Sequence, residues 1–144
     1  RQTYEGQTGA TLESMARPFV DGETGYPVAR TENDPVVLSW EPLWQALLSD
    51  LKSGVLPGQI SARFHNGLME ALSNLAAELA GRHQCRRIVL SGGVMQNALL
   101  ADGLYHRLRK DGLDVLLPRE TPANDGGLAL GQAVIAAAQT VRLP

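Results

Sequence analysis

The chain has 144 residues, of which 44% are hydrophobic and 19% are charged, the composition of one globular domain with a core of its own. The net charge of −2 argues against nucleic-acid binding, and no apolar run approaches the roughly 18 residues that span a membrane. The single cysteine, Cys85, excludes an internal disulfide and favours a reducing, cytoplasmic setting. The polar start at Arg1, without a methionine or a signal peptide, favours a piece that begins mid-domain in a longer protein.

The N-terminal part begins with a short helical pattern and then loses it. Residues 4–17 favour a helix that Pro18 ends. Residues 18–35 are rich in Gly, Pro, Asp and Thr, which favours irregular structure or a loose hairpin around Gly25-Tyr26-Pro27. A short extended run over residues 35–40 follows.

Two helices are expected in the middle of the chain. Residues 41–51 place leucines on one face and are followed by Gly54, a usual helix stop. Residues 58–80 give the clearest pattern, because apolar side chains recur there at spacings of three and four. Gly81 follows as the expected end of that helix.

The last third of the chain alternates between strand and helix patterns. Residues 86–90 and 113–117 favour strands, residues 94–110 favour the helix between them, and residues 126–139 favour a last helix that is apolar almost all round. This order over residues 86–139 predicts a βαβ unit with parallel strands and a helix after it.

The loop after the first of these strands is the first candidate for chemistry. Gly92 and Gly93 follow Ser91, and two successive glycines allow positive φ and a close approach of a ligand to the backbone. The free N–H groups of a following helix attract phosphate, and Asn97, one turn into that helix, is placed to reach a ribose or phosphate oxygen. The alternative is a tight turn in which Ser91 and Asn97 satisfy the local backbone.

The loop before the last helix is the second candidate. Asn124 and Asp125 follow the second strand, so they are expected at the same sheet edge as the first loop, where ligands of parallel sheets collect. The Asp125 carboxylate suits a divalent cation that also contacts nucleotide phosphates. An ordinary helix cap is the competing interpretation, and the two roles can coexist.

Two further residues are weaker candidates. His65 is expected at the border of the apolar face of the 58–80 helix, either as a satisfied border histidine or as a catalytic or substrate contact. Glu5, near the start of the chain, is a candidate ribose ligand or an ordinary exposed acid. The three histidines lack the i, i+4 spacing of a helical metal pair.

Four blocks occur in order along the chain: Tyr4-Glu5-Gly6-Gln7, Ala62-Arg63-Phe64-His65-Asn66, Leu90-Ser91-Gly92-Gly93-Val94-Met95-Gln96-Asn97 and Asn124-Asp125-Gly126-Gly127-Leu128-Ala129-Leu130-Gly131-Gln132-Ala133. Together they resemble the C-terminal part of the HypF family of hydrogenase-maturation carbamoyltransferases, from near Tyr4 to Ala136. The two glycine-containing blocks are the specific ones. A looser version of the blocks occurs in the threonylcarbamoyl-transferases that modify tRNA and in antibiotic O-carbamoyltransferases.

The resemblance implies an α/β fold that is half of an actin/hexokinase-like ATPase domain (ASKHA, RNase H-like), with a short parallel sheet and packed helices. The family forms carbamoyl adenylate from carbamoyl phosphate and ATP. It passes the carbamoyl group to the C-terminal cysteine of a partner, HypE, on the way to the cyanide ligands of nickel–iron hydrogenase. The rest of the same protein is therefore the other expected partner.

Carried over residue by residue, the resemblance makes Gly92, Gly93 and Asn97 nucleotide contacts. Further nucleotide-binding candidates are Ser91, Gln96, Asn124 and Glu5. Asp125 becomes the single ligand of this chain to a divalent metal, either magnesium or iron or zinc. The family's H-x-x-x-H pair of metal ligands is missing from this sequence, so the metal site is incomplete here and the chain alone is expected to be inactive.

Three alternatives stay open at this stage. A small-molecule kinase of the same superfamily would share the glycine loops, and a tRNA-modifying relative would share them with an RNA partner. A non-catalytic α/β interaction module would use the 58–80 helix and the last helix for docking.

Overall fold

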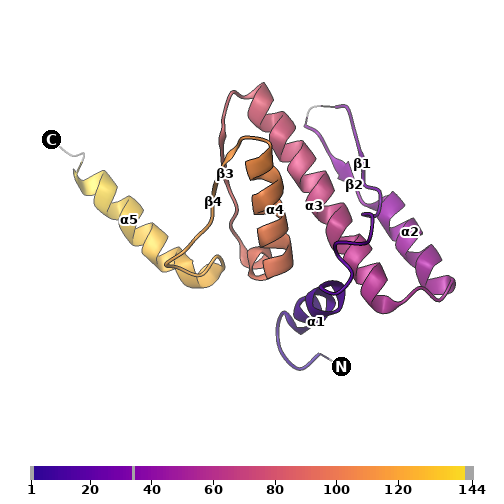
Figure 1. The fold of residues 1–144 in the computed structure, drawn as a ribbon. Helices are drawn as coiled ribbons and strands as arrows, with labels where there is room; N and C mark the ends of the chain where they lie inside the picture. The colour runs from indigo at the N-terminus through magenta and orange to yellow at the C-terminus, as the bar shows by residue number, and fades with distance from the viewer. Residues whose placement is uncertain (1, 34, 142–144) are drawn as a thin grey trace.

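In the computed structural model, which describes residues 2–33 and 35–141, a long central helix organises most of the molecule (Figure 1). This helix is α3 (Pro57–Arg82), and the helices α1 (Gln7–Ala16), α2 (Glu41–Lys52) and α4 (Ala98–Lys110) lie against it. The helix starts at Pro57, which is tolerated in a first turn because its missing N–H would have no partner there. No helix within the described part of the chain is long and apolar enough to cross a membrane.

The expected N-terminal hairpin is present, but its strands lie elsewhere. The strands β1 (Ala29–Arg30) and β2 (Leu38–Ser39) pair antiparallel, so the connection between them runs through residues 31–37. Of the two alternatives expected there, irregular structure is the one found at Gly25-Tyr26-Pro27, and the loose hairpin around these residues was wrong. Tyr26 is instead buried against α2 and α3, with Leu43 and Ile60, because tertiary packing fixes this segment in an extended path over α3.

The segment around Gly25 lies in direct contact with the backbone of α3. A Cβ on Gly67 would lie 2.5 Å from the carbonyl oxygen of Tyr26, and a Cβ on Gly25 would lie 2.5 Å from the amide nitrogen of Gly67. Asn66 adds two hydrogen bonds, from its Nδ2 to the carbonyl oxygens of Val20 and Glu23. Two glycines thus allow a backbone approach that no side chain would permit.

The C-terminal third contains the predicted parallel pair. The strands β3 (Arg87–Val89) and β4 (Asp114–Leu116) pair in parallel with Ile88 opposite Val115, and α4 connects them. Leu108 of α4 is 1% exposed and packs with Leu113 and Val115 and with Ala80 at the end of α3. The burial of this apolar face holds the βαβ unit against α3.

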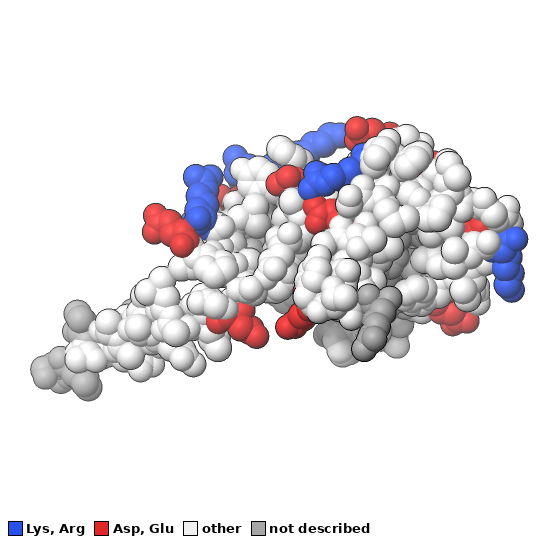
Figure 2. All heavy atoms as spheres, turned by 90° about the horizontal axis from the view of Figure 1, so that it is seen from below, with Lys and Arg blue, Asp and Glu red and all other residues white. Residues whose placement is uncertain are grey.

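The last helix, α5 (Leu128–Val141), projects away from this body (Figure 1). It follows the short 3-10 helix η2 (Asp125–Gly127), and its residues 128–140 are exposed with the side chains of Leu128, Leu130, Val134 and Ile135 more than half exposed. Its sequence contains no Lys, Arg, Asp or Glu, and the face of it that Figure 2 shows is accordingly white. A helix that is apolar all round is normally a buried helix.

Candidate nucleotide-binding site

The loop after β3 has a conformation that only glycine adopts easily. Gly92 has φ +99° and ψ 162°, and ideal Cβ atoms on Gly92 and Gly93 would meet nothing within 4 Å. The 3-10 helix η1 (Gly93–Gln96) follows, and its first bond runs from Met95 N to Gly92 O. Gly93 and Val94 come before Met95, the first residue whose N–H is bonded within the turn, and both of them are exposed.

The prediction that the helix begins at residue 94 was wrong, because α4 begins at Ala98. Asn97 is therefore the residue before the helix and not one turn into it. Its Oδ1 accepts a hydrogen bond from the N–H of Leu100 at 3.0 Å, which is the usual N-cap arrangement. The free N–H groups expected for an anion at the α4 terminus are thus partly satisfied by Asn97 itself, and the open backbone is that of η1.

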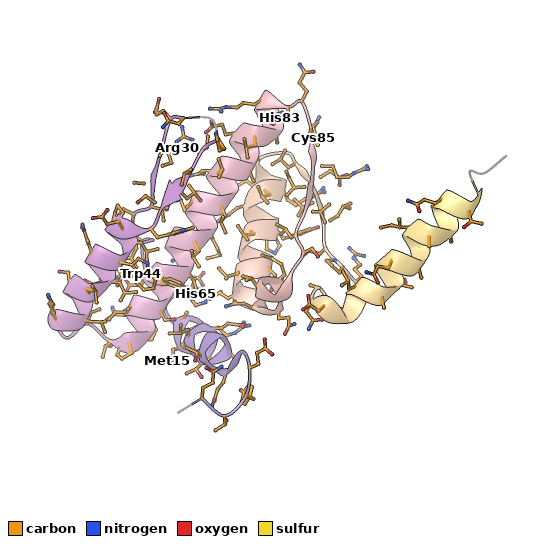
Figure 3. The ribbon with its side chains drawn as sticks, turned by 180° about the vertical axis from the view of Figure 1, so that it is seen from behind. Met15, Arg30, Trp44, His65, His83 and Cys85 are labelled. Carbon is orange, nitrogen blue, oxygen red and sulfur yellow. The ribbon has the colours of Figure 1, made fainter. Side chains whose placement is uncertain are left out.

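The amide nitrogen of Asn97 faces His65 on α3. Asn97 Nδ2 and His65 Nε2 are 3.0 Å apart, and His65 Nδ1 lies 2.7 Å from the carbonyl oxygen of Ser61. His65 is only 2% exposed, so the expectation of a border histidine was wrong: the ring lies inside, at the end of α3 near α1 (Figure 3). The ring reaches the loop through Asn97 and does not face an open surface.

A pocket of about 280 Å³ brings two distant parts of the sequence together. One wall is the start of the chain and α1, and the other is η1 with Asn97. Its lining residues are Tyr4, Glu5, Gly6, Gly9, Ala10, Glu13, Gly93, Val94, Gln96 and Asn97. Four predicted nucleotide contacts, Glu5, Gly93, Gln96 and Asn97, therefore lie around one cavity.

The second glycine loop lies beside the first but outside this pocket. The N–H of Gly92 donates to the carbonyl oxygen of Ala123 at 2.8 Å, which places both loops at one sheet edge. Asn124 caps η2 through its Oδ1, which accepts from the N–H of Gly126 at 3.0 Å. Asp125 is the first residue of η2 and is exposed. Ser91, Gly92, Asn124 and Asp125 are not among the residues that line the cavity.

Asp125 has no partners for a metal among the residues described. No group of three or more His, Cys, Asp or Glu side chains gathers there in a way that holds a metal ion. An exposed carboxylate at a sheet edge supplies one hard oxygen ligand, which suits a divalent cation whose other ligands come from elsewhere.

A charged cluster around Arg63 of α3 holds the segment before β1 in place. Arg63 donates to Glu23 at 2.8 Å and to Asp50 at 2.6 Å, and the Tyr26 hydroxyl donates to Asp50 at 2.6 Å. The hydrogen bond from Arg63, followed by one from Gln59, lowers the pKa of Glu23 below its ordinary value. The hydrogen bonds from Tyr26 and then Arg63 lower the pKa of Asp50.

The same cluster raises the pKa of Tyr26, first through burial and then through the hydrogen bond to Asp50. Arg63 belongs to one of the four sequence blocks, and its role here is to fix the segment before β1 onto α2 and α3.

Ser61 is the residue of this region that the sequence did not single out. Its side chain is buried, and its hydroxyl donates to the carbonyl oxygen of Leu12 in α1 at 2.7 Å. A serine in the first turn of a helix is usually a local cap, so its spacing gives no signal of a contact 49 residues away.

The class of protein is shown by a family match, which agrees with the parallel βαβ unit and the two glycine loops at its edge. Residues 1–132 match the family described as "Carbamoyltransferase, Kae1-like Domain, second subdomain". The chain belongs to this family, and its fold is half of an actin/hexokinase-like ATPase domain.

The individual relatives are HypF proteins. The chain is 38% identical over 136 residues to Carbamoyltransferase HypF of Rhizobium leguminosarum bv. viciae, which covers 94% of this chain and 17% of the relative. A crystal structure of full-length HypF in the phosphate- and nucleotide-bound form matches with a TM-score of 0.87 and 33% identity, over 94% of this chain and 18% of that one. The chain thus spans about a sixth of the length of these relatives.

A more distant relative is the tRNA N6-adenosine threonylcarbamoyltransferase of Clostridium beijerinckii. It is 23% identical over 131 residues, which cover 87% of this chain and 39% of the relative. The family resemblance expected from the four sequence blocks is confirmed by these matches.

Proposed function

We propose that this chain supplies one part of the nucleotide site of a carbamoyltransferase that activates its substrate with ATP. The observation that carries the proposal is the pocket between α1 and η1. It joins Glu5 to Gly93, Gln96 and Asn97, residues of two sequence blocks that lie almost 90 positions apart. At about 280 Å³ the pocket is at the small end of the range for ligand sites, so it holds part of a nucleotide.

The residues of the pocket fit a nucleotide by their chemistry. The open backbone at Gly93 suits a phosphate, because no side chain separates the N–H groups from the ligand. The Glu5 carboxylate suits ribose hydroxyls, which donate hydrogen bonds, and the amide of Gln96 both donates and accepts. Because His65 and the N–H of Leu100 hold the Asn97 side chain, the turn positions the ligand and does not itself react. Ser91, Gly92 and Asn124, which flank the cavity, complete the proposed set of nucleotide contacts.

Asp125 is the residue of this chain proposed to hold a divalent metal, magnesium or iron or zinc. When bound, such an ion neutralises phosphate charge and polarises the reacting phosphoryl group. The chain contributes one carboxylate, at the edge where Gly92 contacts Ala123. The remaining ligands belong to residues outside this sequence, which has no H-x-x-x-H pair.

The proposed reaction forms carbamoyl adenylate from ATP and a carbamoyl group that enters as carbamoyl phosphate. Water cleaves carbamoyl phosphate to carbamate and inorganic phosphate, and a carbamate oxygen then attacks the α-phosphorus of ATP, so that pyrophosphate leaves as the adenylate forms. A cysteine thiolate then attacks the carbamoyl carbon, a C–S bond forms, and AMP leaves. The proposed acceptor is the C-terminal cysteine of HypE, a cytoplasmic partner in the synthesis of the cyanide ligands of nickel–iron hydrogenase. The names and identities of the relatives support this proposal.

The rest of the same protein is the proposed partner of α5. The relatives are about six times longer than the match, and α5 is an uncharged helix with large apolar side chains exposed along it. Burial of these side chains against the rest of the protein would stabilise the assembly through the apolar area removed from water. The isolated chain is accordingly expected to bind nucleotide weakly and to turn over nothing.

Calorimetric titration of the whole carbamoyltransferase with AMP and ATP tests the site. Asn97→Ala and Gln96→Ala are each expected to weaken binding about tenfold, because each removes one polar contact worth about 1.4 kcal/mol. Asn74→Ala, an exposed asparagine of α3 far from the pocket, is the matched control and should bind as the unmodified protein does. Unchanged affinity in both pocket variants would overturn the proposed site.

The products separate the proposed reaction from a kinase reaction. A carbamoyltransferase that adenylates its substrate releases AMP and pyrophosphate, whereas a small-molecule kinase releases ADP. The tRNA-modifying function is the second candidate, favoured by the 23% identity to the threonylcarbamoyltransferase. Transfer to tRNA instead of to a protein thiol would establish it.

A further inference from the structure

One buried turn of α3 contacts both walls of the nucleotide pocket. Ser61 and His65, four residues apart, are each 2% exposed. The Ser61 hydroxyl donates to the carbonyl oxygen of Leu12 in α1, which forms one wall. The His65 ring contacts the amide of Asn97, which forms the other wall. Figure 3 shows His65 at the end of α3 that faces α1.

Hydrogen bonds run in a path from the N–H of Leu100 through Asn97 and His65 to the carbonyl oxygen of Ser61. The direction of each bond follows from the groups at the two ends of this path. The N–H of Leu100 only donates, so the Asn97 atom that it meets is the oxygen, and the atom turned to His65 is the donor Nδ2. His65 Nε2 must therefore accept. The Ser61 carbonyl only accepts, so His65 Nδ1 carries the proton. The ring is thus neutral and in the Nδ1–H tautomer.

No member of this path can be turned without breaking a second bond. If the Asn97 amide flipped, its nitrogen would face the N–H of Leu100 and its oxygen would face the bare Nε2 of His65. Both contacts would then pair like with like. Because His65 is buried, water cannot replace the lost bonds, and each unsatisfied group would carry a desolvation cost. The path therefore fixes the rotamer of Asn97 and the start of α4.

We propose that His65 is a positioning residue that locks Asn97 for nucleotide binding, while Ser61 in the same turn fixes the opposite wall, α1. The proposal rests on the nucleotide site proposed above and adds the residues behind it. His65 does not contact the nucleotide: the Asn97 side chain stands between the ring and the pocket. His65 contributes one hydrogen-bond acceptor, Nε2, at the position that Asn97 Nδ2 requires.

Two substitutions at His65 separate the acceptor from the bulk of the ring. In His65→Gln the terminal amide oxygen can take the place of Nε2, whereas the shorter side chain of His65→Asn can reach Ser61 O but not Asn97. In the whole carbamoyltransferase, the AMP affinity of His65→Gln is expected to stay within about threefold of the original, and that of His65→Asn to fall about tenfold, the equivalent of one such bond. Equal affinities in the two variants would overturn the proposal.

A double-mutant cycle tests whether the effect passes through Asn97. In an Asn97→Ala background, His65→Asn is expected to have no further effect on AMP affinity, since the bond that it breaks is already gone. Additive losses would show that His65 acts by another route and would overturn the inference alone. If Asn97→Ala alone leaves AMP affinity unchanged, the inference about His65 fails, and if Gln96→Ala does so as well, the proposed nucleotide site fails too.

A pair of buried serines on α3 provides the control for the other wall. Ser61 and Ser73 both donate to a carbonyl oxygen, but the bond of Ser73 stays within α3, at Glu70. Ser61→Ala is expected to weaken AMP binding severalfold, whereas Ser73→Ala should leave AMP binding unchanged. The two variants are expected to lower the melting temperature by similar amounts. Equal AMP affinities in the two variants would contradict the role of Ser61.

Discussion

The two glycine loops are neighbours at the sheet edge, but they differ in how the rest of the chain holds them in place. The Gly92 loop runs into a turn that is bonded through Asn97 and His65 to the interior of α3. The Asp125 loop caps itself through Asn124 and continues into α5, whose residues 128–140 are all exposed. One backbone bond, from Gly92 N to Ala123 O, joins the two loops.

The contrast shows which part of the proposed site is held in place by contacts within this chain. The geometry of the first loop follows from contacts within the chain, because its turn, its cap and its buried histidine are all here. The position of the second loop depends on what covers α5, since a helix with exposed Leu128, Leu130, Val134 and Ile135 has no fixed packing of its own. The four predictions below test this difference.

The largest effect is expected at Asp125, where the second loop supplies a charge. In the whole carbamoyltransferase, Asp125→Asn should lower the rate of ATP consumption by about 10³-fold, roughly 4 kcal/mol, because it removes the carboxylate proposed to hold the metal ion that offsets phosphate charge. The melting temperature should not change, since Asp125 is exposed. Glu120→Gln removes an exposed carboxylate of the same connection and should leave the rate unchanged. A normal rate in Asp125→Asn would remove this loop from the site.

A leucine-to-alanine substitution in α4 and one in α5 compare directly how well each helix is packed. Leu108 is 1% exposed, and Leu108→Ala should cost about 3 kcal/mol of unfolding free energy by leaving a cavity. Leu130 is 54% exposed, so Leu130→Ala should cost almost nothing in the isolated chain. In the whole protein it should cost about 2 kcal/mol, if α5 is covered there. Denaturant titration measures both, and a harmless Leu130→Ala in the whole protein would mean that α5 stays uncovered.

The positive φ of Gly92 predicts a smaller loss. Gly92→Ala places a Cβ on a backbone with φ +99° and should cost about 1–3 kcal/mol of stability. Gly131, which lies in α5 with ordinary helical backbone and nothing within 4 Å, is the control. Gly131→Ala should be neutral or slightly stabilising, because alanine is the better helix former. Thermal unfolding of the two variants gives the comparison.

The smallest expected effect is a pH dependence of stability that comes from the ion pairs of Arg63. The pKa values of Glu23 and Asp50 are lowered from ordinary values of 4.5 and 3.8, so their bonds to Arg63 stabilise the fold above those values. That stabilisation is lost as the pH falls through the lowered values, where both carboxylates become protonated. Arg63→Met should therefore lower the melting temperature at neutral pH and make less difference in acid.

Arg119→Met, in the connection before the second loop, is the matched control for this pH series. No ion pair of Arg119 is found among the residues that the structure describes, so its replacement should leave the melting temperature unchanged at every pH. A melting-temperature difference for Arg63→Met that is equally large in acid would contradict the assigned pKa directions.

Much of the fold could be predicted because its signals are local. The three- and four-residue spacing marked α3, and the change of period marked β3 and β4 as parallel partners. The start of α4 was missed, because Gly92 and Asn97 are both good turn residues and the sequence alone does not say which of them precedes the helix. The hydrogen bond that Asn97 Oδ1 accepts from the N–H of Leu100 decides it.

Four residues that line the pocket were candidate nucleotide contacts from the sequence, but their arrangement around one cavity was not predicted. Glu5 and Gln96 were each chosen from a family pattern, and nothing in their spacing brings them together. Their meeting depends on α1 crossing α3, a contact that the buried Ser61 makes through the backbone of α1. The buried position of His65 depends in the same way on α4 packing above it, which periodicity in one helix cannot reveal.

The short sheet has a consequence for how this piece behaves during synthesis. Among the residues that the structure describes, β3 and β4 pair only with each other, and Val89 and Leu116 on them are 63% and 44% exposed. Each strand therefore offers a free edge with apolar side chains, the kind of template to which another extended chain adds readily. A ribosome-bound or truncated form that ends before these edges are covered would recruit chaperones or self-associate, so the order in which the protein emerges and closes matters for its yield.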